Sequence, residues 1–134
     1  MRLNLDCIRE VLIWLQDNQQ MQTCAIFGKG LTGRVETITS TSIPHRIEGY
    51  SAEDILYSIH QMIHGGLLMA RDLGDGGTYM IEDISPHGHE FLENIRNTDN
   101  WETTKKQATQ VGSFSLSVLA NIAANLITKA IQAL

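Results

Sequence analysis

Residues 51–97 constrain the fold of this chain most, because three structural patterns follow one another there. A helical pattern runs into Gly65-Gly66, two apolar segments flank the turn-rich sequence Gly74-Asp75-Gly76-Gly77, and Ser85-Pro86 opens a second helical pattern. Glycine and aspartate tolerate the backbone angles of tight turns, and serine followed by proline is typical of a helix start. A helix, a hairpin and a second helix follow one another in this order in the C-terminal part of a winged helix-turn-helix domain. We therefore predict an α+β fold, a winged helix-turn-helix-like domain with a two-stranded wing and additional C-terminal helices.

The first helix of this segment is expected over residues 51–64. Ser51 can cap it, while Glu53 and Asp54 follow at the positive end of the helix dipole. The strands of the hairpin are expected over 67–73 and 78–84, where apolar and β-branched residues lie on either side of the glycines.

The N-terminal third begins with an amphipathic helix, expected over residues 5–18, because apolar residues recur there at three- and four-residue spacings. Residues 19–47 are instead rich in Gly, Thr and Ser, with strands expected over 34–39 and near 43–47, the latter bent at Pro44. A helix-turn-helix has another helix at this point, and the segment shows no pattern for one. We interpret 19–47 as an irregular or β insertion in a domain of residues 1–98.

Two more helices are expected beyond Asn100, over 101–110 and 115–133, separated near Gly112. The last one has a wide apolar face, formed by Leu116, Leu119, Ala123, Leu126 and Ala130. Such a face must be covered, either by the first helix of the same chain or by the same helix of another subunit. Since the stripe is wider than a packed surface helix needs, we expect a homo-oligomer, with residues 99–134 as its oligomerisation element.

Length, cysteine content and hydropathy bound the class of protein. A chain of 134 residues suffices for one sizeable core and leaves little room for a second. Cys7 and Cys24 are the two cysteines, and Cys7 sits on a helical apolar pattern with no secretory signal before it, which indicates a reduced, cytoplasmic protein. The longest apolar region, residues 114–134, is interrupted by polar residues, so we expect no membrane span.

The net charge of −5 is unevenly spread along the chain. Residues 1–47 carry net +1 and residues 94–134 net +2, whereas residues 48–93 carry nine acidic residues against Arg71 alone, a net charge of −8. Neutralisation of phosphates supplies most non-specific affinity for DNA. A DNA-contacting segment with the negative charge of residues 48–93 would therefore be repelled by the DNA backbone.

Several blocks of the sequence carry a family resemblance: Met1–Asp6, Gly49–Tyr57, His60–Leu67, Gly88–Arg96, Trp101, Thr104-Lys105 and Gly112–Leu116. They resemble a family of small bacterial and phage proteins known only as a domain of unknown function. The resemblance covers residues 1–18 and 48–134, while residues 19–47 fit it loosely. It implies a winged-helix-like fold and a phage or prophage setting, and it supplies no catalytic residues.

Histidine pairs are the first candidate chemical site. His60 and His64 lie one helical turn apart, and His87 and His89 are close in sequence, so a metal site built from these pairs is geometrically conceivable. The chain has no His-Glu-x-x-His arrangement, and neither cysteine lies near these histidines in the sequence. We therefore expect neither a metal ion nor a cofactor.

The glycine-rich stretch 28–34 is the second candidate, because it places three glycines beside Lys29, Thr32 and Arg34. It resembles a phosphate-cradling loop but lacks the Gly-Lys-Ser/Thr ending, so a loop or hairpin tip is the better interpretation and nucleotide or phosphate binding is an alternative. No Gly-x-Ser-x-Gly elbow marks a nucleophilic serine. We expect that the protein is not an enzyme.

The remaining choice lies between a DNA-binding transcriptional regulator and a protein-binding module. Winged helices commonly bind DNA, and an oligomer that gathers Lys105, Lys106, Arg34 and Arg46 would offer a basic surface for it. The charge of the 48–93 segment favours a protein partner instead, such as a component of host transcription or antiviral defence. We place the partner surface on helix 51–64 and the wing, at Glu53, Asp54, Tyr57, His60, Gln61, His64, Asp72 and Asp75.

Overall fold

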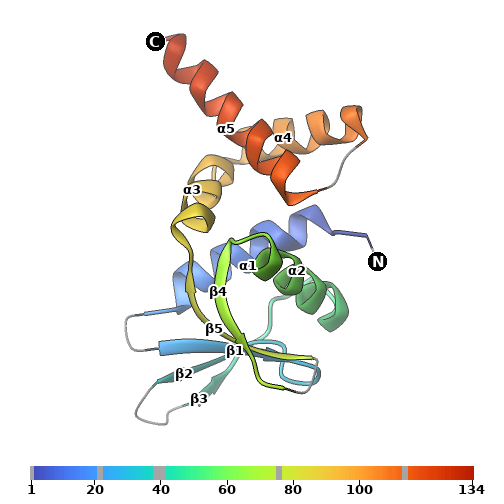
Figure 1. The fold of residues 1–134 in the computed structure, drawn as a ribbon, viewed down its shortest axis with the longest axis vertical. Coiled ribbons are helices and arrows are strands. Elements are labelled where there is room, and N and C mark those ends of the chain that lie inside the picture. The colour runs from blue at the N-terminus through green and yellow to red at the C-terminus, as the bar shows by residue number, and fades with distance from the viewer. Residues whose placement is uncertain (1, 21–22, 38–41, 75–76, 113–114) are drawn as a thin grey trace.

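The computed structural model describes residues 2–20, 23–37, 42–74, 77–112 and 115–134, and for Ser42–Pro44 the backbone alone. Figure 1 shows a sheet at one end of the molecule, the first two helices in the middle and the last three helices at the other end. The elements in chain order are α1 (Leu5–Asn18), β1 (Thr23–Gly28), β2 (Arg34–Thr37), β3 (Ser42–Pro44), α2 (Ala52–His64), β4 (Leu68–Asp72), β5 (Thr78–Ile84), α3 (Pro86–Ile95), α4 (Thr98–Val111) and α5 (Leu116–Gln132).

The sheet is antiparallel, with the strand order β3-β2-β1-β5-β4. This confirms the α+β class. The predicted hairpin is present as β4–β5, and β5 also pairs on its other side with β1, in the register Ile26 to Met80, so the hairpin belongs to a larger sheet. Pairing with β1 satisfies backbone groups of β5 that a free hairpin would leave to water.

Helix ends follow the local sequence signals closely. Side chains of Ser51, Ser85 and Ser115 each accept a hydrogen bond from the backbone N–H three residues on, which caps α2, α3 and α5. Gly66 and Gly112 adopt positive φ angles of 78° and 72° just after α2 and α4, a conformation that costs glycine little. These signals explain why the expected helices and the intervening hairpin are confirmed.

Strand β1 is the main element that the sequence pattern missed. Residues 23–28 lie in the segment interpreted as an irregular or β insertion, where no strand is predicted before residue 34, and they form the central strand of the sheet, with Ala25, Ile26 and Phe27 all buried. A strand covered on both faces lacks the alternation of apolar and polar residues that marks a half-exposed strand. The strand expected near 43–47 is shorter and ends at Pro44, whose nitrogen has no hydrogen to donate to a ladder.

The hydrophobic core is continuous from α1 to α5. Trp101 and Ala108 of α4 and Leu119 and Ala123 of α5 belong to the same buried cluster as Leu12 of α1. Helix α5 packs mainly on α3 and α4, and not on the first helix, which was one of the two alternatives for covering its apolar face. The C-terminal half of α5 extends beyond the other helices (Figure 1).

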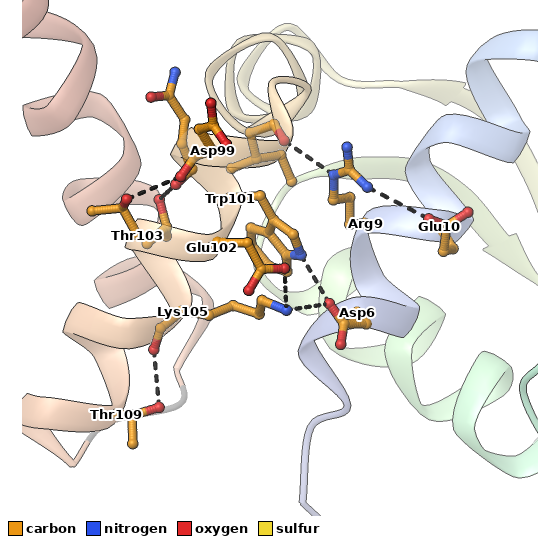
Figure 2. Close-up of polar contacts among 12 residues, drawn as sticks. Asp6, Arg9, Glu10, Asp99, Trp101, Glu102, Thr103, Lys105 and Thr109 are labelled. Atoms are coloured by element: carbon orange, nitrogen blue, oxygen red, sulfur yellow. Dashed lines mark hydrogen bonds and ion pairs between the residues drawn. The ribbon is translucent and has the colours of Figure 1, made fainter.

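A polar junction also links α4 to the start of α1 (Figure 2). The indole Nε1 of Trp101 and the Nζ of Lys105 both donate to Asp6 Oδ1, at 2.9 and 2.8 Å. Partial burial works to raise the pKa of Asp6, but the hydrogen bonds from Lys105 and Trp101 outweigh it, so the pKa lies below its ordinary value. The junction therefore holds a charged carboxylate between two helices that are far apart in the sequence.

Among the described residues, no helix combines the length and the apolar character that crossing a membrane requires.

Candidate functional site

The expected partner residues lie along the outer side of α2. Glu53 and His64 are exposed, while Asp54, Tyr57, His60 and Gln61 are half-buried. Asp72 is exposed on β4, where its Oδ1 accepts from the N–H of Gly74, and Asp75 lies outside the described residues. We refer to Glu53, Asp54, Tyr57, His60, Gln61, His64 and Asp72 as the acidic α2 surface.

An aromatic cluster lies within this surface. The ring centroids of His60 and His64 are 4.4 Å apart, and His60 Nδ1 lies 3.0 Å from the hydroxyl oxygen of Tyr79 on β5. The contact to Tyr79 orients the His60 ring and links α2 to the sheet. These histidines therefore place two imidazole rings, inclined at 63° to each other, beside the carboxylates.

His64 is also brought close to α3. It lines a pocket of about 310 Å³ together with His87, Leu116 and Ser117, at the place where α2 ends and α3 and α5 begin. His89 turns elsewhere, with its Nε2 3.9 Å from Asp83 Oδ1. Within the described part of the chain, no three His, Cys, Asp or Glu side chains come together as metal ligands would.

A second hollow region surrounds Arg46, which lies in the segment that joins β3 to α2. Two pockets, of about 540 and 360 Å³, share His45, Arg46 and Glu48. Gly30, Leu31 and Arg34 line the first pocket, and Ile13, Trp14 and Asp17 are among the residues that line the second. We call these two pockets the Arg46 site.

The five basic residues predicted to contact phosphate or nucleic acid are divided between two ends of the molecule. Arg34 and Arg46 line the same pocket, and Lys29 is exposed in the loop beside it. Lys105 and Lys106 lie on α4, at the opposite end from the sheet (Figure 1). Lys105 is already bonded to Asp6 and lies 3.0 Å from Glu102, so one chain does not assemble all five into a single basic surface.

The two cysteine thiols are held in their neutral form. Burial raises the pKa of Cys7 in α1, and burial together with the carboxylates of Glu36 and Glu82 raises that of Cys24. A thiol rather than a thiolate is a weak nucleophile.

The predicted oligomerisation residues differ in their exposure. Leu119 and Ala123 are fully buried within the chain's own core, Leu116 and Leu126 are half-buried, and Ala130 is exposed. Near the end of α5, the side chain of Ile131 is 63% exposed. The apolar face that remains uncovered therefore begins near Leu126 and continues toward the end of the helix.

Taken together, these features define a small α+β protein with a charged helical surface and pockets of mixed polar and apolar lining. The model of a family described as "Hypothetical protein (DUF2513)" matches residues 2–115, and the chain belongs to this family. The match runs through residues 19–47 and ends at Ser115, the N-cap of α5, so the whole of α5 lies beyond it. No curated protein and no solved structure matches the chain.

Trp14 and His45 carry no sequence signal that marks them as residues of a site. Trp14 falls on the apolar stripe of α1, and His45 follows Pro44 in a segment without periodicity. The fold places their rings 5.3 Å apart at the Arg46 site. The pairing of β2 with β3 and the hydrogen bond from the N–H of His45 to the carbonyl of Gly33 hold the second segment beside the glycine-rich loop.

Proposed function

We propose that the protein acts by binding another protein through the acidic α2 surface, and that it is not an enzyme. The observation that carries this proposal is the composition of α2, whose outer side offers Glu53 and Asp54 beside Tyr57 and two histidines, in a helix without Lys or Arg. Carboxylates accelerate the encounter with a basic surface, and aromatic rings supply contact area. The partner that fits is a protein with a basic patch.

The setting of this binding is part of the proposal. In a phage or prophage, a small acidic protein of this kind would act on a host protein of transcription or antiviral defence.

A DNA-binding regulator is the competing proposal. The pairing of β1 with β5 beside the β4–β5 hairpin, preceded by α2, is compatible with a winged-helix-like arrangement in which α2 would enter the major groove. The negative charge of α2 argues against DNA binding. A recognition helix without Lys or Arg gains no binding affinity from phosphate neutralisation. We expect no tight duplex binding at physiological salt in a gel-shift assay, and a sequence-specific site with steep salt dependence would favour the regulator.

Reversal of charge on α2 tests the protein-binding proposal. Glu53→Lys together with Asp54→Lys should lower recovery of the partner from host extract by roughly tenfold, because the steering charge changes sign at the start of the contact. The loss should be greater at low salt, where charges act over longer distances. Quantitative mass spectrometry after affinity capture measures the recovery.

The matched control is Glu90→Lys together with Glu93→Lys, two exposed acidic residues on α3. It changes net charge by the same amount and should leave capture unchanged. Circular dichroism checks that both variants keep their fold. Equal capture by the wild type and the α2 variant at both salt concentrations would place the partner surface elsewhere.

We further propose that α5 pairs with a second copy of the chain through the face near Leu126. Wild-type protein should be a dimer or larger by light scattering at micromolar concentration, and Leu126→Lys with Ile131→Lys should reduce it to the 14.9 kDa monomer. A charge in a buried apolar seam is costly, whereas both positions lie outside the buried core cluster of a single chain.

Asn125→Lys is the control for this experiment, because it adds one positive charge at an exposed position of α5 next to Leu126. It should leave the assembly intact. A wild-type protein that is monomeric over the whole concentration range would contradict the proposal.

A further inference from the structure

The Arg46 site contains buried hydrogen-bond donors that lack acceptors. Trp14 is 7% exposed, and neither its Nε1 nor the Nε of Arg34 has a hydrogen-bond partner among the described residues. Arg34 lines the larger pocket and Trp14 the smaller one, and buried polar atoms are almost always paired, so orphan atoms on these two residues call for an explanation. Both orphan atoms are donors, and a missing partner must therefore be an acceptor.

The charged groups of the site point to the same chemistry. Arg46 is an exposed guanidinium shared by both pockets, and His45 lies beside it with its ring 5.3 Å from that of Trp14. Arg34 already bonds to Glu36 through Nη2, at 2.6 Å, which leaves its other nitrogens for a further acceptor. Two arginines, an imidazole and an indole N–H offer more donors than the two oxygens of a carboxylate can use, and a phosphate group has more acceptor oxygens.

The backbone beside the site is held in unusual conformations. Gly30 and Gly33 have φ angles of 93° and 108°, and Thr32 has a φ of 39°, the sole positive value among the described non-glycine residues. The N–H of His45 donates to the carbonyl of Gly33 at 2.8 Å, which fixes the glycine-rich loop against the segment that carries Arg46. Strained backbone held by surrounding contacts is frequent at ligand sites.

We infer that the Arg46 site binds a small molecule through a phosphate group. The pocket of about 540 Å³ lies within the usual range for small-molecule sites. The carboxylates of Glu10, Asp17 and Glu48 also line the site, and they would repel a long polyanion such as duplex DNA while tolerating one discrete phosphate. The site shares no residue with the acidic α2 surface, so its test succeeds or fails independently of the proposed protein binding.

The experiment follows the two indole N–H signals in a ¹⁵N-labelled sample, since the chain has two tryptophans. Trp14→Phe removes one signal and so assigns both. Titration with inorganic pyrophosphate should shift the signal of Trp14 along a saturable curve and leave that of Trp101 in place, because the Trp101 indole is bonded to Asp6. Citrate, as a carboxylate ligand, and a short duplex oligonucleotide are titrated in parallel.

Single charge changes test the geometry of the site. Arg46→Gln should weaken pyrophosphate binding by at least about tenfold, the loss expected for one charged hydrogen bond. Glu48→Gln should tighten it by roughly two- to fivefold, because a nearby like charge is removed. Arg71→Gln, on the exposed strand β4, removes the same charge away from the site and should have no effect.

The result that overturns the inference is a Trp14 signal that shows no saturable shift with pyrophosphate in the folded wild-type protein. An equal response to citrate would overturn the assignment to phosphate, and stronger binding of the oligonucleotide would overturn the assignment to a small molecule. Equal weakening by Arg46→Gln and Arg71→Gln would also overturn it, since the effect would then come from net charge alone.

Discussion

Gly88→Ala is expected to lower the free energy of unfolding by about 3 kcal/mol, the upper part of the range for overpacked cores. Gly88 is buried in the first turn of α3, and an added Cβ would overlap the carbonyl oxygen of Leu67 and lie 2.7 Å from Ile84 Cγ2. The first contact is with backbone and cannot be relieved by a rotamer change. The substitution must therefore move α3 away from the strands or distort the chain after α2.

Gly77→Ala is the matched control, because an added Cβ there meets no atom of the described residues within 4 Å and the residue has no positive φ. It should change stability by no more than about 0.5 kcal/mol. Urea denaturation followed by circular dichroism measures both variants. Equal midpoints for Gly88→Ala and the wild type would show that α3 does not pack against Leu67 as described.

Trp101→Ala should destabilise the whole protein by about 3–5 kcal/mol, the range for removing a large buried aromatic ring. Trp101 is 2% exposed, belongs to the continuous core and donates to Asp6 on α1. Because α4 shares its core with α1, the variant should unfold in one transition at a lower denaturant concentration. The loss of stability caused by Trp101→Ala should therefore also be measured at residues far from α4.

Trp101→Phe separates the two contributions of the indole. It keeps most of the buried ring and removes the hydrogen bond to Asp6, so it should cost less than Trp101→Ala, with about 1 kcal/mol arising from the hydrogen bond. Calorimetry and circular dichroism should report coincident transitions. Two separate transitions, with residues 5–95 unaffected by the alanine variant, would show that the C-terminal helices fold independently.

The helices and the β4–β5 hairpin were predictable because their signals are local. Ser51 and Ser85 form caps with the backbone three residues on, and Gly66 and Gly112 end helices through positive φ angles. Each of these interactions spans a few residues, so the local sequence carries the whole physical cause.

The central strand and the Arg46 site depend instead on contacts between distant segments. β1 is a strand because β2 and β5 pair with it on both sides, and its buried run Ala25-Ile26-Phe27 shows no alternation. Trp14, Arg34 and Arg46 come from three separate segments, and their proximity follows from how the sheet packs beside α1. No spacing rule within one segment predicts such a set.

The uncovered face of α5 was only partly predictable for a related reason. The stripe of apolar residues marks which side of the helix is buried, but the pattern does not say which neighbour covers it. Helices α3 and α4 cover Leu119 and Ala123, and the face near Leu126 and Ile131 remains for a second copy in our proposal.

The central claim is that α2 contacts a partner protein, and site-specific photo-crosslinking tests it most directly. A photoreactive residue replaces Glu53 on the acidic α2 surface or, as the control, Glu90 on α3, and both are exposed. After irradiation in host cells, we expect a discrete protein adduct from position 53 and none from position 90. Adducts at position 53 that contain nucleic acid in place of protein, or the same protein adduct from both positions, would contradict the account.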